Sequence, residues 1–281
     1  MLHVIQQHRQ NRHSSIFDLD SHMISPVPNS SSPVSSSASS ESLQSTSSTE
    51  RRDRRFSHLR DQAGRRESYN ARIFKGMRIA GELPNADDIQ QTRREARDAF
   101  ADATTREERR RSIEDALCTI EELENCLPMK AKTDAETNFI YELSALIGWA
   151  YSTMRFCGFV PELPEHFKEL KDHFRRLLPA LPALNEYRFL ATLRFSALCL
   201  EYAEMCDEEA INWCRDALRD LAGSIRSMKA ELSRMTDAFT LSRDIRRLED
   251  VADRLHHNIE QVQFVWTVRL PHEMPIPEKL V

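Results

Sequence analysis

The residues that could bind a metal ion are sparse and poorly spaced in this sequence. On an apolar segment near the C-terminus, Asp253 and His256 stand three residues apart, which is the spacing found in one half of a di-iron site. A di-iron bundle needs two Glu-x-x-His units and two further inward carboxylates, and the sequence offers no match for this fragment. We therefore predict that the protein has no metal site and no other cofactor.

Thiol chemistry is the next candidate. Cys199, Cys206 and Cys214 are spaced seven and eight residues apart, whereas zinc ligands usually come in pairs separated by two to four residues. This spacing favours one buried stripe of small apolar side chains. Because all six cysteines fall in or beside apolar-periodic segments and no secretory signal precedes them, we expect reduced thiols in the cytosol or nucleus.

Motifs of the common enzyme classes do not occur. The 281 residues include only 6 glycines, and neither G-x-G-x-x-G nor G-x-x-x-x-G-K-[ST] is found, although loops that bind phosphate groups depend on glycine. H-E-x-x-H, C-x-x-C and G-x-S-x-G are missing too. The sequence therefore predicts a protein that is not an enzyme. An all-helical enzyme with a site assembled from dispersed carboxylates and histidines is kept as an alternative.

Two serines stand where a basophilic kinase would modify them. Ser57 and Ser68 each come two residues after an Arg-Arg pair, and guanidinium groups at that distance fit the acidic pocket of such a kinase. A phosphate adds nearly two negative charges. We predict phosphorylation at Ser57 and Ser68, but not at Ser112, whose similar motif falls inside an expected helix.

Both serines border a basic segment. Residues 51–78 have a net charge of +7, whereas residues 79–281 have a net charge of −10. Residues 63–82 are interpreted as an amphipathic arm that binds a partner. The contact residues expected in this arm are Tyr69, Arg72, Ile73, Phe74, Lys75, Met77 and Arg78. The same pattern also fits a first helix packed on its own domain, so binding within the chain and binding to a partner both stay open.

Residues 83–270 show the helical period almost throughout. Thr105-x-x-Glu108 and Thr133-x-x-Glu136 have the capping-box pattern and precede apolar stripes. Prolines separate several of the segments. This pattern predicts an all-α domain, a helical bundle of about six or seven helices.

Two heptad patterns occupy the C-terminal third, and they favour long helices that cross at a small angle. The first runs through Cys214, Leu218, Leu221, Ile225, Met228, Leu232 and Met235, and the second through Leu241, Ile245, Leu248, Ala252, Leu255, Ile259, Val262 and Trp266. We predict an antiparallel hairpin with a cap at Thr236-Asp237. One continuous helix, or pairing between two chains in a homo-oligomer, are the alternatives.

The two ends differ from the domain. Residues 1–62 are predicted to be a disordered tail, because 12 serines and two threonines occupy 14 of the 20 positions of residues 30–49. Residues 271–281 begin with proline and contain two more, which predicts an extended tail. The longest uncharged stretch in the hydrophobic part, residues 143–154, is too short to span a bilayer.

One further motif lies within the expected core. Tyr141, Leu146 and Ile147 have a spacing that resembles peptides that dock on the cap-binding translation factor. The residues around them are equally apolar, so we interpret the three side chains as part of the core.

These observations together predict an intracellular interaction module, either an adaptor or a regulatory subunit. Its basic arm would bind a protein partner, and phosphorylation would tune that binding. A nucleic-acid-associated regulatory factor that uses the same arm is the alternative. It is less favoured because the acidic domain would repel a phosphate backbone.

Overall fold

The computed structural model describes residues 68–160, 162–234 and 239–273. Every described residue belongs to one compact unit, Arg66–Val281. The predicted tail at residues 1–62, including Ser57, lies outside the described residues. Within the described part, every assigned element of secondary structure is a helix, which confirms the all-α prediction.

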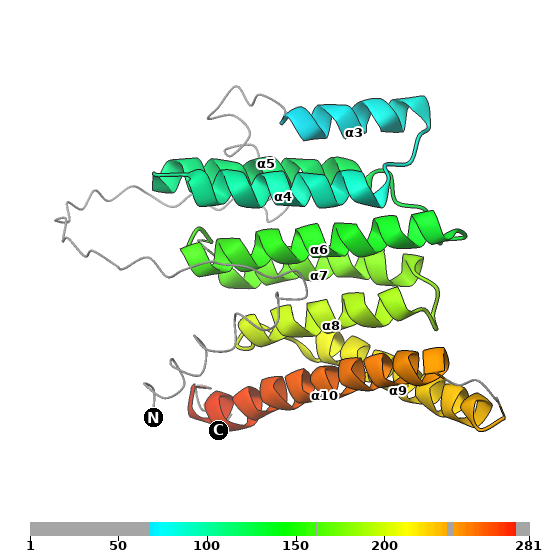
Figure 1. Cartoon of the computed structure of the whole chain (residues 1–281). Coiled ribbons are helices and arrows are strands. Elements are labelled where there is room, and N and C mark those ends of the chain that lie inside the picture. The colour runs from blue at the N-terminus through cyan, green and yellow to red at the C-terminus, as the bar shows by residue number, and fades with distance from the viewer. Residues whose placement is uncertain (1–67, 161, 235–238, 274–281) are drawn as a thin grey trace, which may run out of the picture. The chain divides into compact units, whose positions relative to one another are not determined.

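Eight helices occur in this part of the chain (Figure 1). They are α3 (Tyr69–Ala80), α4 (Ala86–Asp102), α5 (Arg106–Glu124), α6 (Asp134–Cys157), α7 (Leu163–Ala180), α8 (Glu186–Glu201), α9 (Glu208–Leu232) and α10 (Phe239–Glu273). Helices α4 to α10 form the predicted bundle, and α3 occupies the position of the predicted arm. Within the described residues no helix is long and apolar enough to cross a membrane.

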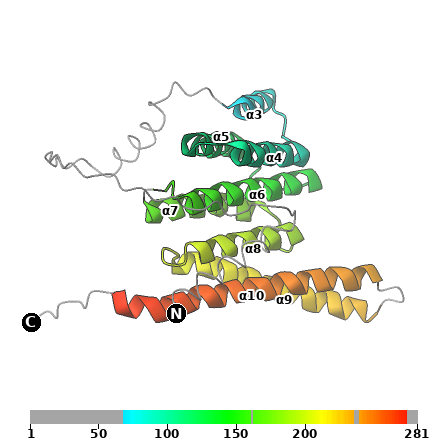
Figure 2. The ribbon, with the colours of Figure 1, turned by 60° about the vertical axis from the view of Figure 1, so that its left-hand side comes forward.

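The helices stack in chain order (Figures 1 and 2). Helix α3 packs on α5, and α4 and α5 pack on each other and on α6. Helix α6 packs on α7 and α8, and α8 packs on the pair formed by α9 and α10. Most contacts therefore join helices that are close in the sequence.

Helix α6 is enclosed on several sides. Fourteen of its 24 residues are buried, because α4, α5, α7 and α8 all contact it. A helix that is covered on several sides needs apolar residues around most of its circumference rather than on one stripe. Leu146 and Ile147 are fully buried here, which confirms that the Tyr141 motif belongs to the core.

The predicted capping signals mark the helix starts. Thr105 and Glu108 form a capping box at the start of α5, and Thr133 and Glu136 form one at the start of α6. Each box satisfies backbone N–H groups that have no partner within the helix. These polar residues determine where the two helices begin.

Two prolines are less disruptive than the sequence suggested. Helix α7 continues through Pro179 to Ala180, and α10 continues through Pro271 to Glu273. A proline removes one backbone N–H, and in the last turn no further turn has to follow it. The predicted start of the extended tail at residue 271 is therefore wrong. Residues 274–281 lie outside the described part.

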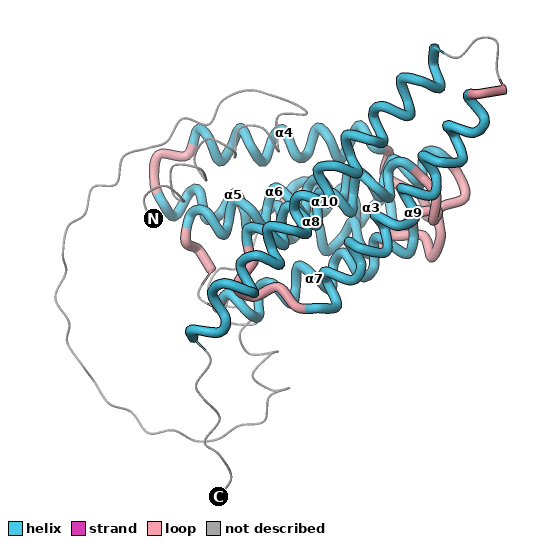
Figure 3. Tube along the Cα trace, turned by 90° about the horizontal axis from the view of Figure 1, so that it is seen from below, coloured by secondary structure: helices cyan, strands magenta, loops and turns pink. Residues whose placement is uncertain are grey.

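Helices α9 and α10 form the predicted hairpin (Figure 3). They contact each other along their length, and Lys229 near the end of α9 forms an ion pair of 2.6 Å with Glu249 in the first half of α10. The alternative of one continuous helix is excluded. The predicted cap at Thr236-Asp237 lies outside the described residues.

Candidate functional site

Helix α3 is delimited by two capping residues. The Ser68 Oγ accepts a hydrogen bond from the Ala71 N–H at 3.1 Å and so caps the N-terminus. Gly81 ends the helix in the left-handed region with φ of 73°, a conformation that glycine adopts without a Cβ penalty. Ser68 and Gly81 therefore set the length of α3.

One face of α3 belongs to the core of its own chain. Ala71 and Phe74 are 1% and 2% exposed, and Met77 is half-buried against the same core. The neighbour of this face is α5. This part of the predicted arm therefore packs within the chain, as the alternative interpretation expected.

Three polar contacts accompany this packing. The Ser68 and Thr119 hydroxyl oxygens are 3.1 Å apart, which joins the start of α3 to α5. Asn70 Nδ2 donates a hydrogen bond of 3.1 Å to a carboxylate oxygen of Glu95 on α4. Near the other end of α3, an ion pair of 3.3 Å joins Arg78 and Glu122. The last two contacts are exposed, and exposed pairs add little stability.

The opposite face of α3 is uncovered. Tyr69, Ile73 and Ile79 are 72%, 41% and 76% exposed, and Arg72 between them is exposed too. We call these four residues the outward face. Within the chain, nothing in the described part covers their large apolar groups.

The structure thus divides the predicted contact set. Tyr69, Arg72 and Ile73 point outward, whereas Phe74 is in the core and Lys75 and Met77 are half-buried. The amphipathic pattern groups Tyr69 and Ile73 with Phe74 as apolar positions, and it does not tell how much of an apolar side a neighbour covers. Sequence reasoning missed Ile79, although it recurs seven residues after Arg72 and so shares its face.

The predicted phosphorylation sites differ in what the structure says of them. Ser68 is described and is the N-cap of α3, whereas Ser57 lies outside the described residues. Ser112 lies inside α5, where its Oγ donates a hydrogen bond of 3.0 Å to the Ala96 carbonyl oxygen. This position inside a helix agrees with the reason for predicting no phosphorylation at Ser112.

Sequence reasoning also missed a group of hydrogen-bonded polar side chains where α5, α6 and α7 meet. The His173 ring links the Tyr151 hydroxyl, 2.8 Å from Nε2, to a Glu124 carboxylate oxygen, 2.5 Å from Nδ1. Because an ionised carboxylate only accepts, Nδ1 donates and Nε2 accepts in the neutral ring. Arg176 also pairs with Glu124 at 2.8 Å. The spacing of these residues gives no signal, since they come from α5, α6 and α7.

Two titratable side chains next to this hydrogen-bonded group have strongly shifted pKa values. Burial, with the nearby His173 and Arg155, lowers the pKa of His166 to about 4, and its ring stacks on Tyr151 with centroids 4.5 Å apart. Burial also raises the pKa of Glu201 to about 7, against a hydrogen bond from Ser152. Among the described residues, one Glu201 oxygen and His166 Nε2 find no hydrogen-bond partner. These groups are packed between helices.

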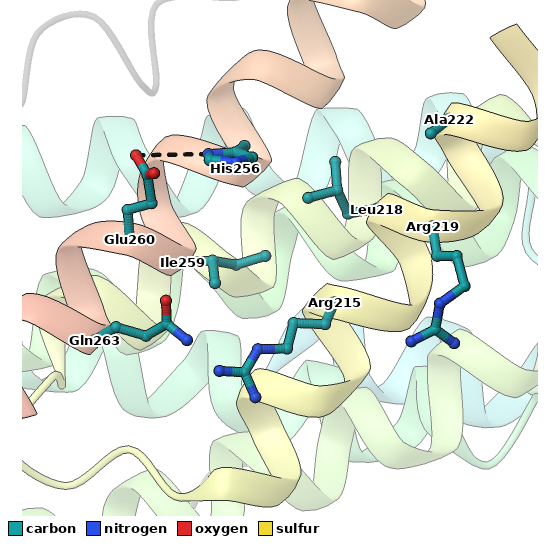
Figure 4. Close-up of a pocket in the computed structure, with 8 residues that line it drawn as sticks. All are labelled: Arg215, Leu218, Arg219, Ala222, His256, Ile259, Glu260 and Gln263. Atoms are coloured by element: carbon teal, nitrogen blue, oxygen red, sulfur yellow. Dashed lines mark ion pairs between the residues drawn. The ribbon is translucent and has the colours of Figure 1, made fainter. Parts of the chain in front are cut away.

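A shallow groove of about 420 Å³ lies between α9 and α10 (Figure 4). Leu218 and Ile259 contribute apolar surface, and Arg215 and Arg219 contribute cations from α9. His256, which with Asp253 has the spacing of half a di-iron site, also lines this groove and pairs with Glu260 at 3.5 Å. In the described part, no group of three or more His, Cys, Asp or Glu side chains is placed to hold a metal ion.

The three cysteines of the predicted stripe are all buried and reduced. Burial and the neighbouring Cys206 and Cys214 thiols raise the pKa of Cys199 well above its ordinary value. A thiol is reactive mainly as a thiolate, so these side chains are suited to packing. The predicted stripe is confirmed.

Comparison with known proteins finds no relative of this chain. No protein-family model, no curated protein and no solved structure matches this chain.

Proposed function

We propose that this protein is an interaction module, an adaptor or regulatory subunit of the cytosol or nucleus, that binds a protein partner through the outward face of α3. The observation that carries the proposal is the exposure of Tyr69 and Ile73, which are 72% and 41% exposed. Phe74 on the same helix is buried, so the exposed groups are presented by an element that is already in place. Binding then orders few additional side chains.

The chemistry of this face favours one kind of partner. Tyr69 and Ile73 require apolar groups that exclude water, and tyrosine and arginine are frequent at the centres of interfaces. Arg72 and the +7 charge of residues 51–78 favour carboxylates around those apolar groups and speed association. The partner is therefore a protein surface with an apolar centre and an acidic rim. Phosphorylation at Ser57 or Ser68 would weaken this attraction.

Point variants test the proposal better than deletion of residues 51–80. Such a deletion removes Phe74 and so uncovers the core, which would change binding for reasons unrelated to the outward face. The double variant Tyr69→Ala/Ile73→Ala leaves the buried face intact. Phe264→Ala on α10 is the matched control, because Phe264 is also aromatic and is 61% exposed.

The experiment uses the full chain as bait, followed by quantitative identification of the captured proteins. A partner should bind the native chain and the Phe264→Ala variant equally and lose at least about tenfold in affinity for Tyr69→Ala/Ile73→Ala. The same loss should recur with the purified partner in a direct titration. The proposal fails if every captured protein binds all three chains alike.

A salt titration separates this proposal from the nucleic-acid alternative. The affinity for single-stranded and duplex oligonucleotides of mixed sequence is measured from low to high salt, beside the affinity for the captured partner. Phosphate binding weakens steeply with salt because counterions are released. A tight, steeply salt-dependent affinity for the oligonucleotides, with no protein partner, would favour the alternative.

A further inference from the structure

We propose that the Ser68 hydroxyl is a latch that holds α3 on α5, and that phosphorylation of Ser68 releases α3 and uncovers the apolar surface beneath it. The inference deepens the proposed function, because it states how a modification of the arm would change the surface that the protein presents. Its structural part stands on contacts within the chain and is testable without a partner.

The proton positions in the latch follow from the contacts of Thr119. Its hydroxyl donates to the Asp115 carbonyl oxygen at 2.8 Å, and a hydroxyl has one proton to donate. In the 3.1 Å contact between the two hydroxyls, Ser68 is therefore the donor and Thr119 the acceptor. Ser68 Oγ at the same time accepts from the Ala71 N–H. One hydroxyl thus caps α3 and ties it to α5.

Phosphorylation removes the proton that the Ser68 hydroxyl donates to Thr119. The Ser68 oxygen forms a bond to the terminal phosphorus of a nucleoside triphosphate, and the bond from that phosphorus to the bridging oxygen breaks. The nucleoside diphosphate leaves, and the hydroxyl proton passes to the base of the kinase. The product has no proton on the Ser68 oxygen, so Thr119 Oγ1 loses its donor.

The modified side chain also no longer fits its place. Thr119 is 2% exposed, so a phosphate kept in contact with it must give up much of its hydration. Thr119 could donate to the phosphate only by giving up its hydrogen bond to the Asp115 carbonyl oxygen, because a hydroxyl has one proton. Moving a charge out of water without a partner is costly, whereas a phosphate at the free N-terminus of a helix is stabilised by the helix dipole. We therefore expect phosphorylated Ser68 to lose its contact with Thr119 on α5 and to keep its place at the N-terminus of α3.

Helix α3 is attached in a way that allows release. Its main neighbour is α5, which also contributes Glu122 to an exposed ion pair with Arg78, and an exposed hydrogen bond joins Asn70 to Glu95 on α4. A 12-residue helix is marginal in isolation, so α3 depends on its packing against α5. Gly81, in the left-handed conformation, stands at the junction to residues 82–85 and gives the chain a place to turn.

Release would expose groups that are now covered. Ala71 and Phe74 on α3 are 1% and 2% exposed, and Thr119 lies on the matching surface of α5. The freed helix carries the outward face and this buried face together, so it presents a larger apolar surface, whereas the added phosphate weakens the electrostatic attraction to an acidic rim. The Arg-Arg pair before Ser68 in the sequence is the feature that a basophilic kinase would recognise.

The test places phosphoserine at residue 68 of the full chain by genetic encoding and measures amide hydrogen exchange along the chain. We expect exchange of residues 69–80 and 116–123 to be at least about tenfold faster than in the unmodified protein, because a lost buried hydrogen bond and a buried charge together exceed the energy of a tenfold change. Exchange in α8 to α10 should be unchanged.

Two controls separate the latch from a general effect of charge. Phosphoserine at Ser227, which is exposed on α9, should leave exchange in α3 as it is. Ser68→Asp keeps a cap that accepts from the Ala71 N–H but cannot donate to Thr119, so it should speed exchange in α3 partially. The proposal is overturned if α3 stays equally protected in the protein with phosphoserine at residue 68, or if the Ser227 control opens it to the same extent.

Failure of this inference and failure of the proposed function are distinguishable. Hydrogen exchange of the isolated chain reports only the latch, whereas the capture experiment with Tyr69→Ala/Ile73→Ala reports only the outward face. A normal latch with no partner would contradict the function, and a partner without a change in α3 exchange would contradict the latch.

Discussion

The Asn258 side chain donates a hydrogen bond of 2.9 Å from Nδ2 to Ser196 Oγ, across the contact between α10 and α8. Both residues are buried, and Ser196 Oγ donates in turn to the Leu193 carbonyl oxygen at 2.7 Å. A polar pair inside an apolar helix contact favours one alignment of the helices, since any other alignment leaves the amide unpaired. The pair therefore helps to determine how the C-terminal hairpin sits on α8.

Replacement of Asn258 should test that role. We expect Asn258→Ala to lower the free energy of unfolding by about 1–3 kcal/mol, because a buried hydrogen bond is lost and a small cavity is left. Urea unfolding followed by circular dichroism gives the value. Asp253→Ala, at an exposed position on the same helix, should change it by less than about 0.5 kcal/mol. Equal effects of the two changes would contradict the assignment.

The two faces of α3 should respond differently to truncation. Phe74→Ala removes a side chain that is 2% exposed, and we expect a loss of about 3 kcal/mol in the stability of α3. Tyr69→Ala removes one that is 72% exposed and should cost less than about 0.5 kcal/mol. Hydrogen exchange of residues 69–80 measures both changes. The division of the arm into two faces is wrong if Tyr69→Ala opens α3 as much as Phe74→Ala.

Glu201 should make the protein less stable as the pH rises. Burial raises its pKa from 4.5 to about 7, so between these values the folded chain keeps a proton that the unfolded chain has lost. The free energy of unfolding falls across this window, and the penalty is complete above about pH 7. Glu201→Gln removes the titration, and its stabilising effect should be about 2 kcal/mol larger at pH 8 than at pH 5.

Urea unfolding of the native chain and of Glu201→Gln at pH 5 and pH 8 measures this difference. Glu231→Gln, at an exposed position near the end of α9, is the control and should show no such dependence. A Glu201→Gln effect that is the same at both pH values would mean that Glu201 is already ionised at low pH.

His166 should act in the opposite direction, on the acid side. Burial lowers its pKa from 6.5 to about 4, so below pH 6.5 the unfolded chain binds a proton that the folded chain does not. Stability is lost as the pH falls from about 6.5 to about 4. His166→Phe keeps a ring that can stack on Tyr151 and removes the titration, so the loss between pH 7.5 and pH 5 should shrink by about 2 kcal/mol.

The measurement is the free energy of unfolding at pH 7.5 and pH 5 for the native chain and for His166→Phe. His256→Phe is the matched control, because the His256 side chain is 59% exposed. An unchanged acid sensitivity in His166→Phe would show that His166 is charged in the folded protein.

Local sequence signals were most informative where the physics is local. The Thr105 and Thr133 capping boxes marked helix starts correctly, because a cap involves residues only three positions apart. The heptads of residues 214–266 likewise predicted the α9 and α10 hairpin. The predicted start of the extended tail at residue 271 was wrong, because the cost of a proline depends on how much helix follows it.

The candidate site depended more on tertiary contacts. The sequence marked residues 63–82 as amphipathic, but a pattern of apolar positions does not say which of them a neighbour covers. Phe74 is covered by the packing of α3 on its own chain, whereas Ile79 stays exposed. The contact between Ser68 and Thr119 joins residues 51 positions apart, a separation at which no spacing rule operates.

From the sequence alone we predict that the described part is helical, where α5 and α6 start, and that the long C-terminal helices pair. Period, caps and heptads suffice for this because each acts within a few turns of one helix. The packing of the helices determines which side of α3 faces solvent, and it brings Tyr151, Glu124 and Arg176 together at His173. Burial and charge at those places come from residues that the fold brings together from separate helices.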